Sequence, residues 1–193
     1  MKIGIYGEEV INYLEAYYNN YDEEGRLLSR HGQVEYLTTM KYIQECIAEV
    51  SNPMILEVGA GTGRYSVTLA KQGFKVTAVE LVEHNLEILR SKLCGEEPIT
   101  AIQGNALDLS AFADNTFDLT MVLGPMYHLY TKKDKLQVLS EAVRVINLEV
   151  RSDNMSAIHL YEKYGYKKTG MIPAFFKIDK EYVDFDNMSL DLR

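Results

Sequence analysis

A glycine-rich turn directly after a short apolar run constrains the fold of this chain more than any other feature. The run is Met54-Ile55-Leu56-Glu57-Val58, and the turn is Gly59-Ala60-Gly61-Thr62-Gly63. A short apolar run that ends in a turn signal predicts a buried strand. Three alternate glycines predict a turn whose backbone approaches a ligand so closely that side chains would fill the ligand's space. The pattern therefore predicts a strand, a ligand-binding turn and a helix.

Strands and helices then alternate along the chain. Further strands are predicted over 75–80, 99–103 and 117–123, with helices after the glycine turn and over 84–93 and 132–146. Such alternation predicts a Rossmann-like α/β fold, a three-layer sandwich with a mostly parallel sheet. Sheets of this kind bind ligands beyond the carboxyl ends of their strands, where the glycine turn lies. In the last helix, the apolar spacing aligns Leu136, Leu139, Val143 and Ile146 on one stripe.

The flanking regions have their own patterns. Upstream, helical spacing is predicted over 8–18 and 34–49, separated by a polar loop or short helix over 19–32 that can fold over a ligand. Downstream, the sequence predicts a strand over 148–151, a helix over 154–164 and strands near 166–172 and 175–190.

Two common phosphate-binding turns do not fit this glycine pattern. A P-loop requires Lys and then Ser or Thr after its last glycine, whereas Gly63 is followed by Arg64 and Tyr65. The dinucleotide fingerprint G-x-G-x-x-G requires glycine where Arg64 stands. The residues therefore disfavour a nucleoside triphosphate, NAD or FAD as the ligand.

The segment Glu57-Val58-Gly59-Ala60-Gly61-Thr62-Gly63 resembles motif I, E/D-x-G-x-G-x-G, of the class I S-adenosylmethionine-dependent methyltransferases. The resemblance extends over about residues 20–146. It implies S-adenosyl-L-methionine as the cofactor and a small molecule or a protein as the methyl acceptor. The cofactor-binding residues that it implies are Glu57, Gly59, Ala60, Gly61, Thr62, Gly63, Glu80, Leu81, Asn105, Ala106, Leu123, Gly124 and Arg26.

The same resemblance implies individual roles. Glu80 ends the second strand, where the family's acidic residue accepts hydrogen bonds from both ribose hydroxyls, and one carboxylate can serve a vicinal diol. Leu81 is expected to cover the adenine. Asn105 stands where the family has aspartate, and its amide oxygen can still accept a hydrogen bond from the adenine amino group. Leu123 and Gly124 are expected near the methionine part.

Methyl transfer mainly requires alignment of acceptor, methyl and sulfur, and it needs a general base only if the acceptor must lose a proton. The segment Pro125-Met126-Tyr127-His128-Leu129-Tyr130 follows the fourth strand, where this family meets its substrate. His128 is the candidate base, with Tyr127 and Tyr130 as contacts. The alternative for His128 is a structural hydrogen bond on a helix face. Upstream, Arg26 or Arg30 either pairs with the methionine carboxylate or belongs to a solvated loop.

The tail, residues 147–193, contains the pattern L-x-V-x-x-x-N-x-x-A-x-x-L-Y-x-x-x-G-Y from Leu148 to Tyr166. This pattern resembles the end of a GNAT-type N-acetyltransferase. The resemblance implies that Tyr161 protonates a coenzyme A thiolate and that Asn154 contacts that cofactor. The family's pyrophosphate loop, Q/R-x-x-G-x-G/A, is absent, so a purely structural role for the tail is favoured. We therefore expect a methyltransferase region over 1–146 with an N-terminal helical cap. The tail is expected to pack onto the same sheet and complete it, with the last strand antiparallel between its neighbours.

Composition limits the remaining classes. A net charge of −8 argues against general binding to nucleic acid or anionic membranes. Two cysteines and four histidines show no metal-type spacing, so no metal is expected. There is no leader-like segment and no long apolar run, which predicts a cytoplasmic protein. Two other functions stay open: an acetyltransferase fragment that binds coenzyme A, and an inactive fusion that still binds S-adenosylmethionine.

Overall fold

The computed structural model describes residues 8–18, 20–21, 23–26, 28–145, 149–163, 165–178 and 181–190. Three helices come first: α1 (Glu8–Tyr18), α2 (Glu23–Arg26) and α3 (Arg30–Ile47). The central part contains β1 (Met54–Val58), α4 (Arg64–Lys71), β2 (Lys75–Glu80), α5 (Glu83–Ser91), β3 (Ile99–Gln103), β4 (Leu119–Val122), the 3₁₀ turn η1 (Pro125–Tyr127) and α6 (Lys132–Val145).

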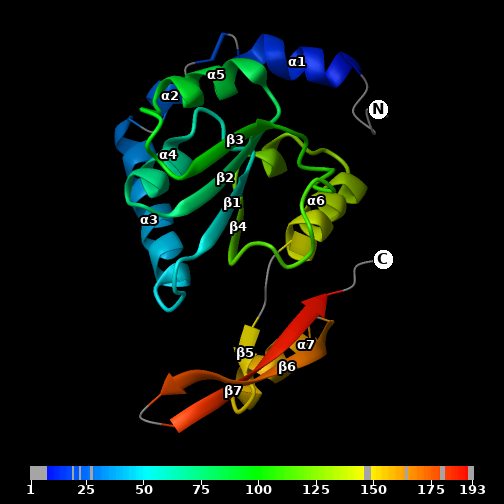
Figure 1. Cartoon of the computed structure of the whole chain (residues 1–193). Coiled ribbons are helices and arrows are strands. Elements are labelled where there is room, and N and C mark those ends of the chain that lie inside the picture. Colours follow the sequence, from blue (N-terminus) through cyan, green and yellow to red (C-terminus); the bar gives the residue numbers. More distant parts are fainter. Residues whose placement is uncertain are drawn as a thin grey trace.

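The four central strands form one parallel sheet in the order β3-β2-β1-β4, which confirms the Rossmann-like α/β fold (Figure 1). The chain steps outward from β1 to β3 and then returns to the other side of β1 as β4. The switch point therefore lies between β1 and β4, and the glycine turn follows β1 at this point. Ligands of open α/β sheets bind at such switch points.

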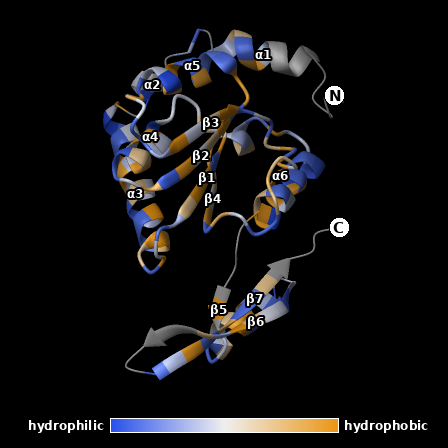
Figure 2. Ribbon diagram, in the orientation of Figure 1, coloured by the Kyte–Doolittle hydropathy of each residue, from blue (hydrophilic) through white to orange (hydrophobic). Residues whose placement is uncertain are grey.

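Helices cover both faces of this sheet. Ile55 of β1 packs in a cluster with Met40 of α3 and Leu69 of α4, whereas Leu56 packs in a cluster with Val145 of α6. Successive side chains of a strand point to opposite faces, so a strand covered on both sides reads as a continuous apolar run. Figure 2 shows the hydrophobic colour along these strands and the hydrophilic colour on much of the surrounding helices.

The predicted apolar stripe of α6 is not the buried face of the helix, and its last member, Ile146, lies outside the described residues. Leu136 and Leu139 are 51% and 42% exposed, while the buried residues are Val138, Ala142 and Val145. The helix carries two stripes with helical spacing, and the sheet meets the one with the smaller side chains. Apolar spacing alone does not distinguish them.

Half of the segment over 19–32, predicted as a polar loop or short helix, is helical. Residues 23–26 form α2, and α3 begins at Arg30 rather than near residue 34. The hydroxyl of Ser29 accepts a hydrogen bond from Gly32 N at 3.1 Å and caps the first turn of α3. The start of α3 is thus fixed by a serine that the apolar pattern did not include.

The tail does not complete the parallel sheet, and this expectation is wrong. It contains β5 (Glu149–Arg151), α7 (Met155–Lys163), β6 (Tyr166–Ile178) and β7 (Glu181–Leu190), which form a separate antiparallel sheet in the order β5-β7-β6 (Figure 1). The strand expected beside Val122 pairs with β7 instead, with Arg151 opposite Phe185. The long β6–β7 pair supplies that partner, and Val150, Ile158 and Met188 form a small core of the tail's own.

Two tail residues with implied acetyltransferase roles have structural contacts. Asn154 Oδ1 accepts a hydrogen bond from Ala157 N at 3.1 Å, as an N-cap does. The ring of Tyr161 lies 5.7 Å from that of Tyr166, between centroids. The acetyltransferase resemblance and the division into 1–146 and 147–193 stay predictions.

Candidate cofactor site

Two glycines of the turn are required by the packing of the chain itself. Gly59 has φ 75° and Gly63 has φ 81°, values that favour glycine. A Cβ on Gly59 would lie 2.4 Å from Cδ of Pro125, and one on Gly63 would lie 2.5 Å from Cγ of Leu89. We predicted that side chains in this turn would occupy the space of the ligand. At Gly59 and Gly63 they would instead clash with η1 and α5.

The Glu80 carboxylate joins this turn to the end of β2. Its Oε2 accepts a hydrogen bond from Gly61 N at 2.7 Å, and its Oε1 accepts one from Val82 N at 2.9 Å. The residue is only 6% exposed. Burial raises the pKa of the Glu80 carboxyl above its ordinary value, and the hydrogen bonds oppose that rise. A carboxylate whose orientation is fixed by backbone hydrogen bonds thus lies beside the turn.

Glu57 is a second buried carboxyl beneath the turn, 2% exposed. It accepts hydrogen bonds from Ser66 N at 3.0 Å and from the Ser66 hydroxyl, which ties β1 to α4. Burial raises the pKa of Glu57 to about 7, and the negative charge of Glu80 contributes to the rise. Glu57 is therefore a structural tie that also changes its charge near neutral pH.

A cavity at the carboxyl ends of the strands contains the Glu80 carboxylate; we call it the Glu80 cavity. It is lined by Leu14, Tyr18, Gly59, Glu80, Leu81, Val82, Asn85, Gly104, Asn105, Ala106, Gly124, Pro125, His128 and Leu129. Asn105 Oδ1 accepts a hydrogen bond from Leu107 N at 3.0 Å, which fixes the amide. The structure thus brings together the predicted residues from the ends of β1, β2, β3 and β4.

An adjoining cavity is rich in aromatic residues; we call it the tyrosine cavity. It is lined by Tyr17, Tyr18, Tyr21, Arg26, Glu35, Thr39, Glu57, Gly59, Arg64, Tyr65, Leu123, Gly124, Tyr127 and His128. The two cavities share Tyr18, Gly59, Gly124 and His128. They are therefore neighbouring parts of one site. Ala60, Gly61, Thr62 and Gly63 are not among the lining residues of either cavity.

His128 lies on the boundary between the two cavities. Its Nε2 is 2.6 Å from the hydroxyl of Tyr18, in a hydrogen bond that joins the end of η1 to α1. Tyr127 lines only the tyrosine cavity and is 83% exposed, and Tyr130 lines neither. His128 is thus the better positioned of the two predicted catalytic residues.

The side chain of Arg26 forms an ion pair within the protein. Its Nη1 donates to both carboxylate oxygens of Glu35, at 3.0 and 2.9 Å, so the side chain lies along α3 at the wall of the tyrosine cavity. Arg30 is exposed and lies outside both lining sets. The pairing of Arg26 with a ligand carboxylate stays a prediction.

Sequence reasoning missed several lining residues, chiefly Leu14, Tyr18, Val82 and Asn85. Leu14 and Tyr18 are four residues apart on α1, so they share a helix face, but that spacing is equally typical of a core stripe. Asn85 is a polar residue that is 2% exposed in the first turn of α5. No local pattern distinguishes it from a surface asparagine.

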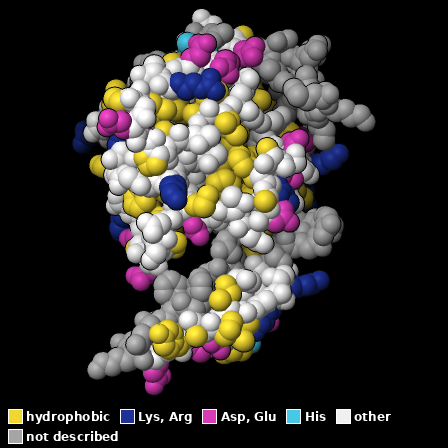
Figure 3. All heavy atoms as spheres, in the orientation of Figure 1, with side chains coloured by type: hydrophobic (Ala, Val, Ile, Leu, Met, Phe, Trp, Pro, Cys, Tyr) yellow, Lys and Arg dark blue, Asp and Glu magenta, His cyan; other side chains and the backbone are white. Residues whose placement is uncertain are grey.

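The described residues contain no group of three or more metal-ligating side chains. No helix in the part of the chain that the structure describes is long and apolar enough to cross a membrane. On the face in Figure 3, the Lys and Arg side chains are scattered rather than gathered in one stripe.

Comparison with known proteins decides the family of the central part. Residues 55–148 match the family described as "Methyltransferase domain". Residues 55–148 form a methyltransferase domain. This domain contains β1, the glycine turn, Glu80 and His128, so both cavities are built mainly on it.

Two curated relatives have similar sequences. This chain is 30% identical over 130 residues to the putative methyltransferase YqeM of Bacillus subtilis (strain 168), covering 67% of this chain and 49% of the relative. It is 31% identical over 127 residues to the demethylmenaquinone methyltransferase of Clavibacter sepedonicus, covering 65% of this chain and 49% of that one. The chain thus spans about half the length of these relatives.

A solved structure has the same fold. The magnesium protoporphyrin IX methyltransferase of Synechocystis PCC 6803, determined with bound S-adenosylmethionine, superposes with a TM-score of 0.59. The match covers 99% of this chain and 100% of that one at 12% identity. At this identity the likeness supports the fold of the methyltransferase domain and says nothing about the acceptor.

Proposed function

We propose that this chain binds S-adenosyl-L-methionine in the Glu80 cavity and transfers its methyl group to an acceptor in or near the tyrosine cavity. The observation that carries the proposal is the buried Glu80 carboxylate, oriented by Gly61 and Val82 beside the glycine turn of a methyltransferase domain. The acceptor is a small molecule or a protein.

The residues of the Glu80 cavity fit an adenosyl group. An ionised carboxylate has about four lone-pair sites, and each Glu80 oxygen accepts one of the two backbone hydrogen bonds, so both oxygens keep capacity for ribose hydroxyls. Leu81 and Leu14 offer apolar surface to a flat base. Asn105 offers an amide at the end of β3, where we predicted an adenine contact.

The charge of the site fits a cation. Glu57 and Glu80 are both buried, and a nearby positive charge would favour their ionised forms. Bound S-adenosylmethionine supplies a methyl group that a positively charged sulfur activates for transfer. The tyrosine cavity, which contains Glu57, Leu123 and Gly124, then takes the methionine end, with Arg26 as the predicted partner of its carboxylate.

His128 acts as the base when the acceptor carries a proton that must leave. It lines both cavities, so its ring lies between the adenosyl site and the proposed acceptor site. Tyr18 fixes the ring orientation by its hydrogen bond to Nε2. Tyr127, exposed at the tyrosine cavity, offers a contact for the acceptor. The chain otherwise acts by alignment and by keeping water from the reacting atoms.

Calorimetric titration of the whole chain with S-adenosylhomocysteine and, separately, with coenzyme A tests this proposal. We expect saturable binding of S-adenosylhomocysteine and none of coenzyme A. Binding of coenzyme A alone would favour the acetyltransferase alternative for the tail. Binding of S-adenosylhomocysteine without methyl transfer to any candidate acceptor would favour an inactive fusion.

A further inference from the structure

Arg64 carries a buried hydrogen-bond donor that the proposed reaction does not use. It is the first residue of α4, directly after the glycine turn, and it lines the tyrosine cavity. Its Nε atom is buried and has no hydrogen-bond partner among the residues that the structure describes. A buried donor without a partner costs free energy, so its presence in a native fold requires an explanation. The side chain as a whole is partly exposed, so a small rotation brings its N–H groups to a ligand in the cavity.

The structure holds the Arg64 guanidinium in a defined place. Its Cζ lies 4.7 Å from the ring centroid of Tyr36 on α3, in a cation–π contact. The Tyr36 hydroxyl donates to Oγ1 of Thr68 at 2.9 Å, and the Tyr36 ring stacks on that of Tyr65 with centroids 5.3 Å apart. The ring is therefore fixed against α4 and supports the guanidinium from one face. Because the N–H groups lie in the guanidinium plane, this contact leaves them available for an anion.

The other arginine of the tyrosine cavity already has an anionic partner. Arg26 donates to both carboxylate oxygens of Glu35, and both side chains are partly exposed. This pair presents one positive and one negative group to the cavity. A zwitterionic methionine end carries a carboxylate and an ammonium group, so it matches the pair in charge. Arg64 is then left for a second anion.

The tyrosine cavity has room for more than a methionine end. Its volume is about 550 Å³, within the range of about 300–1,000 Å³ that is typical of small-molecule sites. The rings of Tyr17 and Tyr21 stack with centroids 5.1 Å apart, and both residues are exposed, as is Tyr127. Aromatic rings favour flat, ring-bearing ligands because such rings stack on or against one another. The walls of the cavity therefore favour a flat acceptor.

The charges of the cavity favour a carboxylate over a phosphate. Glu35 and Glu57 line the same cavity as Arg64. A phosphate dianion would be repelled by these carboxyls more strongly than a monoanion. The planar fork of one guanidinium also matches the two oxygens of a carboxylate.

We infer that the methyl acceptor is a small molecule that bears a carboxylate on a flat ring, and that Arg64 binds this carboxylate. This inference rests on the proposed function and narrows its acceptor. The tyrosines contact the ring, and His128 lies between this part of the site and the methyl donor. Arg64 thus selects the acceptor without taking part in cofactor binding.

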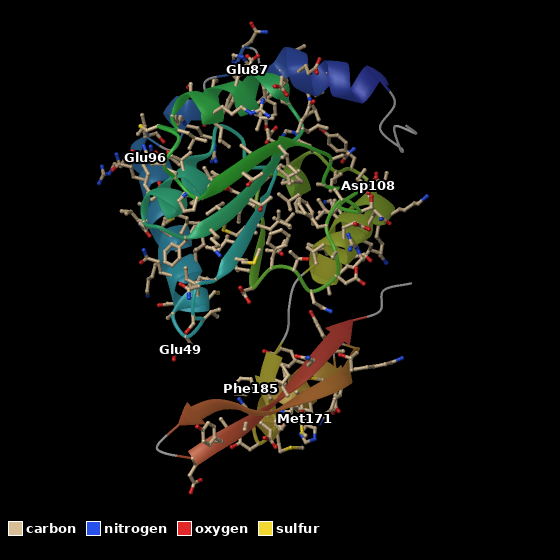
Figure 4. The ribbon with its side chains drawn as sticks, viewed as in Figure 1. Glu49, Glu87, Glu96, Asp108, Met171 and Phe185 are labelled. Carbon is tan, nitrogen blue, oxygen red and sulfur yellow. The ribbon has the colours of Figure 1, made fainter. Side chains whose placement is uncertain are left out.

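Two substitutions change this interaction. Arg64→Met removes the charge and keeps an unbranched side chain, whereas Arg64→Lys keeps the charge and loses the planar fork. Lys71→Met is the matched control, because Lys71 is exposed at the end of the same helix and lines neither cavity. Glu49→Gln alters the net charge at a distance, because Glu49 is exposed beyond the end of α3 that lies away from α2 (Figure 4). Thermal melts establish that each variant folds, and Arg64→Lys carries the test if Arg64→Met does not fold.

The first measurement compares two flat probes of the same shape, 2-naphthoate and 2-naphthamide. Each is titrated by NMR into the chain saturated with S-adenosylhomocysteine. We expect the wild type to bind the carboxylate about 10-fold more tightly than the amide, the size of a hydrogen bond between charged groups. This preference should fall below about twofold in Arg64→Met, take an intermediate value in Arg64→Lys and persist in both controls. A wild type without the preference, or a preference that survives Arg64→Met, overturns the inference and leaves the proposed function standing.

The second measurement separates the acceptor from the cofactor as the source of the carboxylate. Calorimetry gives the affinities for S-adenosylhomocysteine and for 5′-methylthioadenosine, which lacks the amino-acid end. We expect Arg64→Met to bind both within about twofold of the wild type, because Arg26 and Glu35 meet that end. A loss confined to S-adenosylhomocysteine would assign Arg64 to the cofactor's own carboxylate and overturn the inference. If the wild-type chain binds no S-adenosylhomocysteine, the proposed function fails and the inference fails with it.

Discussion

The backbone N–H of Gly61 lies 2.7 Å from Oε2 of Glu80 and donates a hydrogen bond to it. This contact joins the glycine turn after β1 to the last residue of β2, across the pair of strands at the centre of the sheet. The two motifs that most strongly suggested a cofactor site are therefore parts of one structural unit. A substitution in the glycine turn should therefore disturb the Glu80 carboxylate, and a substitution of Glu80 should disturb the turn.

Replacement of Glu80 by Gln should weaken binding of S-adenosylhomocysteine by about 1–3 kcal/mol, since it removes a charge-assisted acceptor and places an amide donor against a backbone N–H. Calorimetry measures the change. The same substitution at exposed Glu87 should leave the affinity as it is. Equal affinities of wild type and Glu80→Gln would refute the ribose assignment.

Gly59→Ala should destabilise the fold more than Gly73→Ala does. Both glycines have positive φ, but a Cβ on Gly73 meets nothing within 4 Å, whereas one on Gly59 meets Pro125. The backbone term is about 1–2 kcal/mol at each position, and the clash should add roughly 1–3 kcal/mol at Gly59. Urea unfolding of both variants measures the difference, and similar losses would mean that Pro125 moves aside easily.

Protonation of Glu57 should make the fold more stable at low pH. Its pKa is about 7 in the folded protein against 4.5 for the ordinary value. Below about pH 4.5 the carboxyl is protonated in both the folded and unfolded chain, and the stabilisation is complete. As the pH rises toward 7, the unfolded chain loses this proton first, so the free energy of unfolding falls until the folded carboxyl ionises too.

Glu57→Gln tests this effect, because Gln can still accept the hydrogen bond from Ser66 N. The variant should match the wild type in unfolding free energy near pH 4.5 and exceed it at pH 8, by on the order of 3 kcal/mol. Urea unfolding at the two pH values gives both differences. A variant that is less stable than the wild type at pH 8 would contradict the expected direction.

His128→Ala should lower turnover without a comparable effect on cofactor binding. For an acceptor that must lose a proton, removal of a general base lowers the rate by about 10²–10⁴-fold. Tyr18→Phe removes the hydrogen bond to Nε2 and should give a smaller loss. Labelled S-adenosylmethionine, used with an acceptor found by screening, measures the rates. Full activity of His128→Ala would assign His128 to structure alone.

The central sheet and its ligand edge could be predicted from sequence because their signals are local. Ile55 to Val58 form an apolar run that ends in glycine, and Glu80 ends the next strand. Local patterns were insufficient where two different packing arrangements are compatible with the same sequence pattern. Both faces of α6 have helical spacing, and only the sheet selects Val138 over Leu139.

Non-local pairing explains the error in the tail. The order of strand, helix and two strands is the same whether β5 joins the parallel sheet or pairs with β7, because the difference lies in contacts between distant residues. Tyr18 was missed for a similar reason. Its partner, His128, belongs to another element of the fold, and no spacing in the sequence indicates this contact.

A crystal structure of the chain with S-adenosylhomocysteine tests the central claim most directly. The account predicts both ribose hydroxyls at hydrogen-bond distance from the Glu80 carboxylate, about 2.5–2.7 Å, with the adenine beside Leu81. Ligand density elsewhere, with Glu80 contacting only Gly61 and Val82, would contradict it.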